Sequence, residues 1–154
     1  MNLNASRASF SIQDEESLPG GLIGKNAPEL SEGHWINSSP HKLSDFKDRV
    51  VLLEFWTYGC YNCRNTIPKI NEWQQQFATK GFVIIGVHTP EFGQEKDFLN
   101  VHKETTRLGI QYAVVTDNEY QTWNLYHQQY WPTICREIAT RSHVNRESSA
   151  RLER

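Results

Sequence analysis

The sequence predicts a single α/β domain in which helices flank a sheet. Segments rich in apolar and β-branched residues alternate with segments whose apolar residues recur at helical spacing. A length of 154 residues suits one domain and is too short for two of ordinary size. Alternation of this kind is typical of right-handed βαβ units, in which helices cover a largely parallel sheet.

The two ends of the chain differ in character from its middle. Residues 1–20 are polar and lack periodicity, so we expect a flexible N-terminal arm there and a domain over residues 21–139. Residues 26–40 hold short apolar pieces among Gly, Ser, Asn and Pro, which is typical of an irregular or hairpin entry. Ser44 is the predicted N-cap of a short turn through Phe46.

The centre of the sheet is predicted from residues 50–87. The run VVLLEFW at 50–56 is nearly continuously apolar, as a strand buried on both faces requires. Residues 82–87 form a second such run, and the helix-length connection between the two indicates a βαβ unit. Pro68 lies within the connecting helix, where it removes a hydrogen bond and bends the axis. The apolar face of this helix consists of Cys63, Ile67, Ile70, Trp73 and Phe77.

The remaining elements continue the alternation. Apolar positions between 98 and 108 predict a second helix, which Gly109 ends, and residues 110–115 predict a third strand. Aromatic side chains between 120 and 126 predict a third helix. Residues 134–139 form a last short apolar piece.

Charge and hydropathy argue against two classes of partner. With 16 Lys and Arg against 18 Asp and Glu, the formal net charge is -2, so no overall positive field attracts nucleic acid. No segment approaches the roughly 18 apolar residues of a membrane span, and the first 20 residues hold no secretory apolar run. We expect a cytoplasmic monomer that is not inserted in a membrane. The alternative is a periplasmic or extracytoplasmic domain of a longer parent.

Two cysteines separated by two residues, Cys60 and Cys63, lie at the predicted start of the first helix. A C-x-x-C beside a βαβ pattern is typical of a redox motif that closes a small disulfide. The N–H groups of a helix start favour a thiolate at Cys60, the predicted nucleophile, and Cys63 is the predicted resolving thiol. The Cys60–Cys63 disulfide is the only redox group expected, without a separate cofactor.

Metal binding is the alternative use of this spacing. A structural zinc needs four ligands, whereas only Cys135 remains besides the pair and the six histidines show no zinc-finger spacing. A copper site that combines the pair with a distant histidine such as His88 is a second metal alternative. We predict no metal.

Residues around the pair are candidates for supporting roles. Glu54 interrupts the apolar strand six residues before Cys60. If it points under the helix, burial raises the pKa of its carboxyl and suits it to exchange a proton with Cys63. The alternative is a solvent-facing glutamate on a less buried strand. The predicted substrate-contacting residues are Trp56, Tyr58, Tyr61, Trp131 and Pro132.

Four motifs together resemble the thioredoxin-like redoxins of the TlpA and DipZ group: FWTYGCYNC, a proline eight residues after the first cysteine, GVHTPEF and YWPT. The resemblance covers residues 24–133. It implies a thioredoxin-like fold with a central mixed sheet and with the reactive pair at the end of the first core strand. It also implies a cis Pro132 beside Cys60, a substrate groove bordered by Trp131, and Glu54 at the position of a buried acid. The implied partners are protein dithiols or disulfides and an upstream redox partner.

The chain departs from this group in two places. The dipeptide Tyr61-Asn62 is neither Gly-Pro nor Pro-His, so the direction of electron flow does not follow from it. After Thr133, the residues carry arginine at a spacing of five and lack a Gly or Pro turn, which suits neither helix nor hairpin. We expect a truncated or frame-shifted end that lacks the last strand and helix, with an irregular tail over residues 140–154.

Thiol:disulfide exchange with protein thiols is the predicted activity. A thiol-dependent peroxidase is the enzymatic alternative, since TYGC at 57–60 resembles the T-x-x-C of peroxiredoxins. A non-enzymatic metal-binding redoxin is the other alternative. Cys135 lies three residues beyond Pro132, about 10 Å along a strand, which is too far for easy pairing with Cys60. We expect Cys135 to be a small buried apolar residue.

Overall fold

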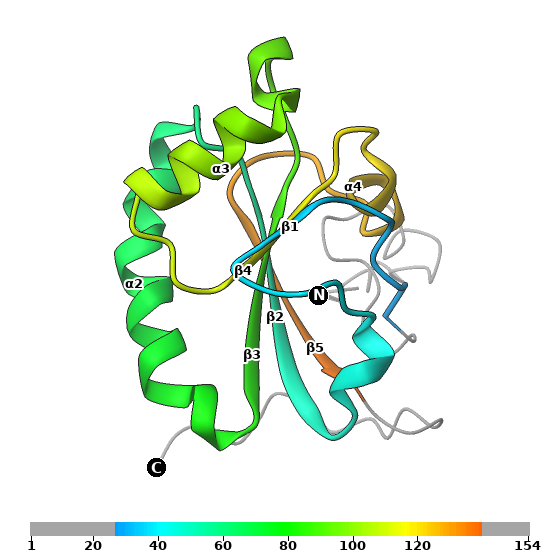
Figure 1. Ribbon diagram of the computed structural model, residues 1–154. Coiled ribbons are helices and arrows are strands. Elements are labelled where there is room, and N and C mark those ends of the chain that lie inside the picture. The colour runs from blue at the N-terminus through cyan, green and yellow to red at the C-terminus, as the bar shows by residue number, and fades with distance from the viewer. Residues whose placement is uncertain (1–26, 140–154) are drawn as a thin grey trace, which may run out of the picture.

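The computed structural model describes residues 27–139, whose arrangement Figure 1 shows. A five-stranded sheet has the order β1-β4-β3-β2-β5. The arm expected over residues 1–20, and the truncated end and tail expected at 140–154, lie outside the described residues. The strands are β1 (Trp35–Ile36), β2 (Arg49–Trp56), β3 (Phe82–His88), β4 (Ala113–Thr116) and β5 (Thr133–Ala139).

The sheet is mixed, as predicted. Strands β2, β3 and β4 are parallel, whereas β1 runs antiparallel to β4 and β5 antiparallel to β2. The apolar run at 50–56 thus forms an internal strand with a neighbour on each side. In the pairing of β2 with β5, Phe55 lies opposite Thr133. The loop before β5 therefore reaches the same end of the sheet as the residues that follow β2.

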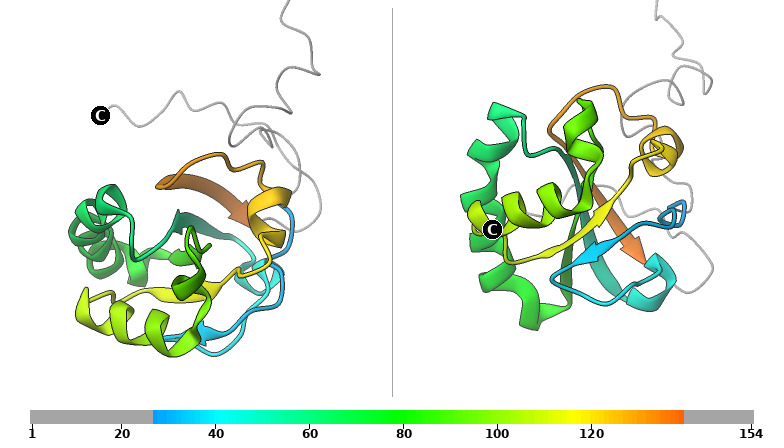
Figure 2. Two further views of the ribbon diagram at one scale, coloured as in Figure 1. Left: turned by 90° about the horizontal axis from the view of Figure 1, so that it is seen from above. Right: turned by 45° about the horizontal axis from the view of Figure 1, so that its top comes forward.

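Helices cover both faces of the sheet (Figure 2). Helices α2 (Tyr61–Phe77) and α3 (Phe98–Arg107) pack on one face. Helix α4 (Gln121–Leu125) and the 3-10 helix η1 (Leu43–Phe46) pack on the other. The molecule is the three-layered α/β structure that the alternating pattern predicts.

Two more 3-10 helices connect these elements. They are η2 (Ala78–Lys80), which follows α2, and η3 (Gly93–Lys96), which follows β3. Pro68 lies inside α2 without ending it, as predicted. Among the residues described, no helix is long and apolar enough to cross a membrane.

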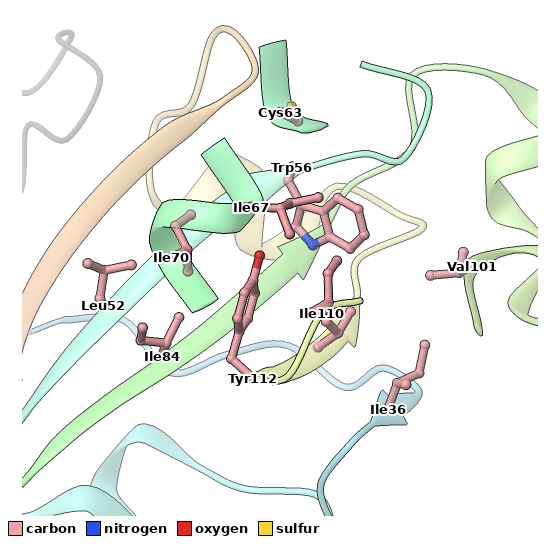
Figure 3. Packing of buried hydrophobic residues seen from close by; sticks show 11 residues of the cluster. Ile36, Leu52, Trp56, Cys63, Ile67, Ile70, Ile84, Val101, Ile110 and Tyr112 are labelled. Carbon is pink, nitrogen blue, oxygen red and sulfur yellow. The ribbon is translucent and has the colours of Figure 1, made fainter. Parts of the chain in front are cut away.

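Strand β2 divides the core into two layers. Its odd-numbered side chains from Val51 to Phe55 face η1 and α4, and its even-numbered ones from Leu52 to Trp56 face α2. Figure 3 shows the layer under α2, where side chains from α2, from β2 and β3 and from the segment before β4 meet. Glu54 lies between Leu52 and Trp56 on the strand, so it belongs to this layer.

Helices η1 and α4 depart from the prediction. Ser44, the predicted N-cap, lies inside η1, and Lys42 occupies the cap position. The Glu29 carboxylate accepts the N–H groups of Leu43 and Ser44, at 2.7 and 3.0 Å, so an acid from before the turn supplies the acceptor that we expected from serine. Helix α4 starts only after Tyr120, whose backbone has a left-handed conformation with φ of 58°.

The third strand is also shorter than predicted. It begins at Ala113 rather than at residue 110. The Asn37 side-chain amide donates to the carbonyls of Ile110 and Tyr112, at 2.9 and 3.1 Å. The Gln111 N–H, between them, donates to the Asn71 side-chain oxygen at 3.0 Å. Asparagine side chains and the Thr105 carbonyl, which accepts the Ile110 N–H at 3.1 Å, therefore bind this backbone in place of a neighbouring strand.

Gly86 in β3 gives a test of this packing. A Cβ at Gly86 would lie 2.8 Å from Trp56 Nε1 and 3.1 Å from Tyr112 Cε2. We expect Gly86→Ala to lower the free energy of unfolding by about 1–3 kcal/mol because the layer is overpacked. Urea denaturation measures this change. Gly93→Ala is the matched control, since no atom lies within 4 Å of the added Cβ. An equal loss in both variants would contradict the packing.

Candidate active site

The two cysteines of the C-x-x-C motif lie where the chain turns from β2 into α2. Cys60 is the N-cap residue of α2, and its Sγ accepts a hydrogen bond from the Cys63 N–H at 3.2 Å. The Cys60 N–H in turn donates to the Thr57 carbonyl at 3.3 Å, which closes the turn. Cys60 and Cys63 both carry free thiols. The helix dipole and the Cys63 N–H both favour negative charge on the Cys60 sulfur.

The two thiols differ in their access to solvent. Cys60 is half-buried, whereas Cys63 is fully buried. Burial raises the pKa of the Cys63 thiol well above its ordinary value, and the hydrogen bond with Cys60 and the charge of Glu54 raise it further. Cys63 is therefore a protonated thiol at neutral pH. This arrangement suits Cys60 to attack a substrate first and Cys63 to attack the resulting mixed disulfide.

Glu54 lies under the helix that carries the pair, and its side chain is fully buried. The alternative of a solvent-facing glutamate is therefore wrong. The hydroxyls of Thr66 and Tyr112 donate to its two carboxylate oxygens, at 2.9 and 2.7 Å. Burial raises the pKa of Glu54 to about 7, although both hydrogen bonds oppose the shift. The carboxyl can thus gain or lose a proton near neutral pH.

The Trp-Pro loop lies at the same end of the sheet. The Trp131–Pro132 peptide bond is cis, as the resemblance implies. Trp131 Nε1 donates to the Thr89 carbonyl at 3.0 Å, and the indole packs on Trp123 with ring centroids 4.3 Å apart. Both Trp131 and Pro132 are half-buried, so each keeps some surface in contact with solvent.

The other three aromatic residues predicted to contact substrate differ in exposure. Tyr61 is 69% exposed, and the Arg64 guanidinium lies 6.0 Å from its ring centroid. Tyr58 is half-buried, and its hydroxyl donates to the Gln94 carbonyl at 3.0 Å. Trp56 is fully buried in the layer under α2 (Figure 3). Trp56 therefore supports the turn from inside and offers no surface to a substrate.

His88, the distant ligand of the copper alternative, lies directly behind the cysteine turn at the end of β3. It is fully buried, and its Nε2 lies 3.4 Å from both Thr57 Oγ1 and the Tyr58 backbone nitrogen. The rings of His88 and Tyr58 stack at a centroid distance of 5.6 Å. Burial lowers the pKa of His88 to about 4, so the imidazole is neutral at neutral pH.

Glu95 in η3 is a buried acid that the sequence analysis missed. Its Oε2 accepts hydrogen bonds from the N–H groups of Glu91 and Phe92, at 2.6 and 3.1 Å. Its Oε1 has no hydrogen-bond partner among the described residues and lies so close to Gly59 that a Cβ there would overlap it. The Glu95 carboxylate therefore occupies the space that a side chain at Gly59 would need. The GVHTPEF motif, which ends shortly before Glu95, was the only sequence signal near it.

Cys135 lies away from the pair. It is buried, as predicted, and sits in β5 opposite Leu53, in the layer that faces α4. Gln128 Nε2 donates to its Sγ at 3.4 Å. The sheet thus separates Cys135 from Cys63. Within residues 27–139, no group of three or more His, Cys, Asp and Glu side chains could hold a metal ion.

Comparison with known sequences places this site in a wider group. Residues 23–144 match the AhpC/TSA family. Protein DipZ of Mycobacterium bovis is 44% identical over 101 residues, which make up 64% of this chain and 14% of DipZ. The thiol-disulfide oxidoreductase ResA of Geobacillus thermodenitrificans is 31% identical over 113 residues, which make up 72% of this chain and 60% of ResA. The chain thus spans less than two thirds of the length of either relative.

A solved structure has the same fold. The thioredoxin domain of a thiol-disulfide oxidoreductase from Bacteroides vulgatus superposes with a TM-score of 0.63 at 25% identity. The match covers 75% of this chain and 81% of that domain. The thioredoxin-like fold and the resemblance to the TlpA and DipZ group are both confirmed.

Glu54 and His88 have opposite effects on the pH dependence of stability. The Glu54 proton is held up to about pH 7 in the folded protein but lost near 4.5 in the unfolded chain, so this group destabilises the fold as the pH rises between those values. His88 loses its proton at about pH 4 in the folded protein and near 6.5 in the unfolded chain, so it stabilises the fold as the pH rises through that range. Each effect amounts to about 3 kcal/mol, and they largely cancel between pH 4.5 and 6.5.

Single substitutions should separate the two effects. We expect the free energy of unfolding of Glu54→Gln to rise between pH 4.5 and 6.5, and that of His88→Gln to fall, in urea denaturation at several pH values. Glu72→Gln, which removes an exposed carboxylate, should follow the unmodified protein. Parallel profiles for the Glu54 and His88 variants would contradict this assignment.

Proposed function

We propose that this chain, which belongs to the AhpC/TSA family, is a thiol:disulfide oxidoreductase that acts on protein thiols through Cys60 and Cys63. The contrast within the pair carries the proposal, because a half-buried sulfur at a helix N-terminus stands next to a fully buried thiol. One sulfur can meet a substrate while the other is kept for the second step. In this proposal the disulfide of the pair is the redox group, and no separate cofactor takes part.

Exchange proceeds in two steps. The Cys60 thiolate attacks one sulfur of a substrate disulfide, forms a mixed disulfide and releases the other substrate sulfur as a thiolate. Cys63 then gives up its proton and attacks the Cys60 sulfur, which closes the Cys60–Cys63 disulfide and releases the second substrate sulfur. The substrate gains the two electrons that the pair loses. An upstream redox partner returns the pair to the dithiol form, and the reverse sequence oxidises a substrate dithiol.

Glu54 accepts the Cys63 proton in this proposal. A buried thiol with a raised pKa attacks slowly unless a base removes its proton. The pKa of Glu54 is about 7, so roughly half of the carboxyl groups are ionised at neutral pH. A base of this strength can take the proton during resolution and return it to Cys63 when the pair is reduced again.

The substrate surface is assigned to the side chains that reach solvent around the end of β2. Tyr61 is the most exposed of these, and Tyr58, Trp131 and Pro132 keep part of their surface in solvent. Aromatic surface beside a reactive sulfur suits an unfolded or extended protein segment, which can bury apolar side chains there.

Thr57 weighs against the peroxidase alternative. A threonine hydroxyl that served the reactive sulfur would have to face Cys60. The Thr57 side chain is instead fully buried, and its Oγ1 lies 3.4 Å from His88 Nε2. The Thr57 hydroxyl thus lies beside His88, which weighs against a role of this threonine at the Cys60 sulfur.

Cysteine variants test the proposed exchange. In an insulin-reduction assay with dithiothreitol, we expect Cys60→Ser to lose more than about 99% of the catalysed rate, because the nucleophile is gone. Cys63→Ser should accumulate a mixed disulfide at Cys60, which mass spectrometry of the acid-quenched reaction detects.

Cys135→Ser is the control, because this cysteine lies in the other core layer, and it should keep the catalysed rate within about twofold. Full activity of Cys60→Ser would refute the exchange mechanism. Peroxide consumption that survives Cys63→Ser would favour the peroxidase, and zinc or copper retained in stoichiometric amount after dialysis would favour the metal-binding alternative.

A further inference from the structure

Tyr112 is a buried residue next to the site that the exchange mechanism does not use. It comes from the segment before β4 and is 1% exposed. Figure 3 shows its ring among Ile70, Ile84 and Ile110, with the hydroxyl pointing toward α2 and away from its own backbone. That hydroxyl donates to Glu54 Oε2 at 2.7 Å, which joins residues 58 positions apart in the sequence.

Hydrogen bonds and close packing hold the segment that carries Tyr112. The Asn37 side chain binds the Tyr112 carbonyl at 3.1 Å, and Asn71 of α2 binds the neighbouring N–H at 3.0 Å. Gly86 leaves the space that the ring occupies, since a Cβ there would lie 3.1 Å from Tyr112 Cε2. The ring is therefore held where its hydroxyl reaches Glu54.

The hydrogen bond is of the charge-assisted kind. A phenol that donates to a carboxylate stabilises the ionised form more than the neutral one. Burial and the nearby Glu54 charge raise the pKa of Tyr112 far above its ordinary value, so the phenol keeps its proton at neutral pH. Tyr112 is thus a permanent donor to one of the two Glu54 oxygens.

The second donor to Glu54 is shared. Thr66 Oγ1 lies 2.9 Å from Glu54 Oε1 and 2.7 Å from the Cys63 carbonyl. A hydroxyl has one proton, so it serves one of these acceptors at a time or divides the bond between them. The Tyr112 hydroxyl has no such competing acceptor in the described structure. Its hydrogen bond to Glu54 is therefore the one that is not shared.

We propose that Tyr112 is a positioning residue for the resolving step, whose hydroxyl holds the Glu54 carboxylate ready to accept the Cys63 proton. This role rests on the proposed function, because it concerns the second step of the exchange. It makes Tyr112 part of the proton-accepting unit, in which it acts through Glu54.

Tyr112→Phe tests the role because it removes the hydroxyl and keeps the ring. We expect the pKa of Glu54 to rise by about one to two units, as measured by NMR titration of the ¹³C-labelled glutamate carboxyl. At pH 7 the ionised fraction then falls from about a half to below about a tenth, so resolution slows roughly fivefold or more. At about pH 9.5 the two rates should converge, which a purely structural defect would not produce.

The resolving step can be followed with oxidised glutathione as the substrate. Cys60 forms a mixed disulfide with glutathione, and its decay as Cys63 attacks is read by mass spectrometry of acid-quenched samples. Tyr126→Phe is the matched control, since Tyr126 is another buried tyrosine, whose hydroxyl binds the Pro28 carbonyl at 2.7 Å in the other core layer. It should leave the Glu54 titration and the pH profile unchanged.

Two results would overturn the inference. One is an unchanged Glu54 titration in folded Tyr112→Phe, and the other is a shifted titration with an unshifted pH profile of resolution. In a Glu54→Gln background, Tyr112→Phe should cause no further change in the profile, and an additional shift there would also refute the role. If the unmodified protein forms no Cys60–Cys63 disulfide with glutathione, the proposed function fails, and the carboxyl titration shows separately whether Tyr112 controls Glu54.

Discussion

Strand β2 pairs with β3 on one side and β5 on the other, and helices cover both of its faces, so residues 51–56 are buried. A carboxylate in such a strand must find its hydrogen-bond donors inside the protein. Glu54 finds them in Thr66 on α2 and Tyr112 before β4. Glu54 thus connects β2, helix α2 with its cysteines, and the segment before β4. The site depends on this connection because Cys63 is equally cut off from water.

The segment from His88 to Glu95 binds both the cysteine turn and the Trp-Pro loop. It holds the cysteine turn through Tyr58, whose ring stacks on His88 and whose hydroxyl binds the Gln94 carbonyl. It also holds the Trp-Pro loop, since Trp131 Nε1 binds a carbonyl in the same segment. Two parts of the proposed substrate surface that are far apart in the sequence are therefore anchored to one short stretch after β3. Their relative position can be kept without direct contact between them.

Local patterns were enough to predict the elements that carry the chemistry. The apolar face from Cys63 to Phe77 predicts α2, and strand alternation places Glu54 under it, because both depend on residues close together in the chain. The start of β4 could not be predicted in this way, since asparagine side chains from two distant segments satisfy the backbone before it. The partner of Glu54 was equally hidden, because Tyr112 in an apolar run has the same pattern as any aromatic core residue. Long-range contacts of this kind leave no local signal.

The buried carboxylate of Glu95 also bears on how this loop can diverge. A Cβ at Gly59 would overlap the Glu95 carboxylate. On the other side of Cys60, the side chains of Tyr61 and Asn62 are exposed. Substitutions between the two cysteines can therefore change the surface and the chemistry of the pair without repacking the interior. A side chain at position 59 would first require the acid beneath it to move. Divergence, natural or engineered, is therefore less constrained after the nucleophile than before it.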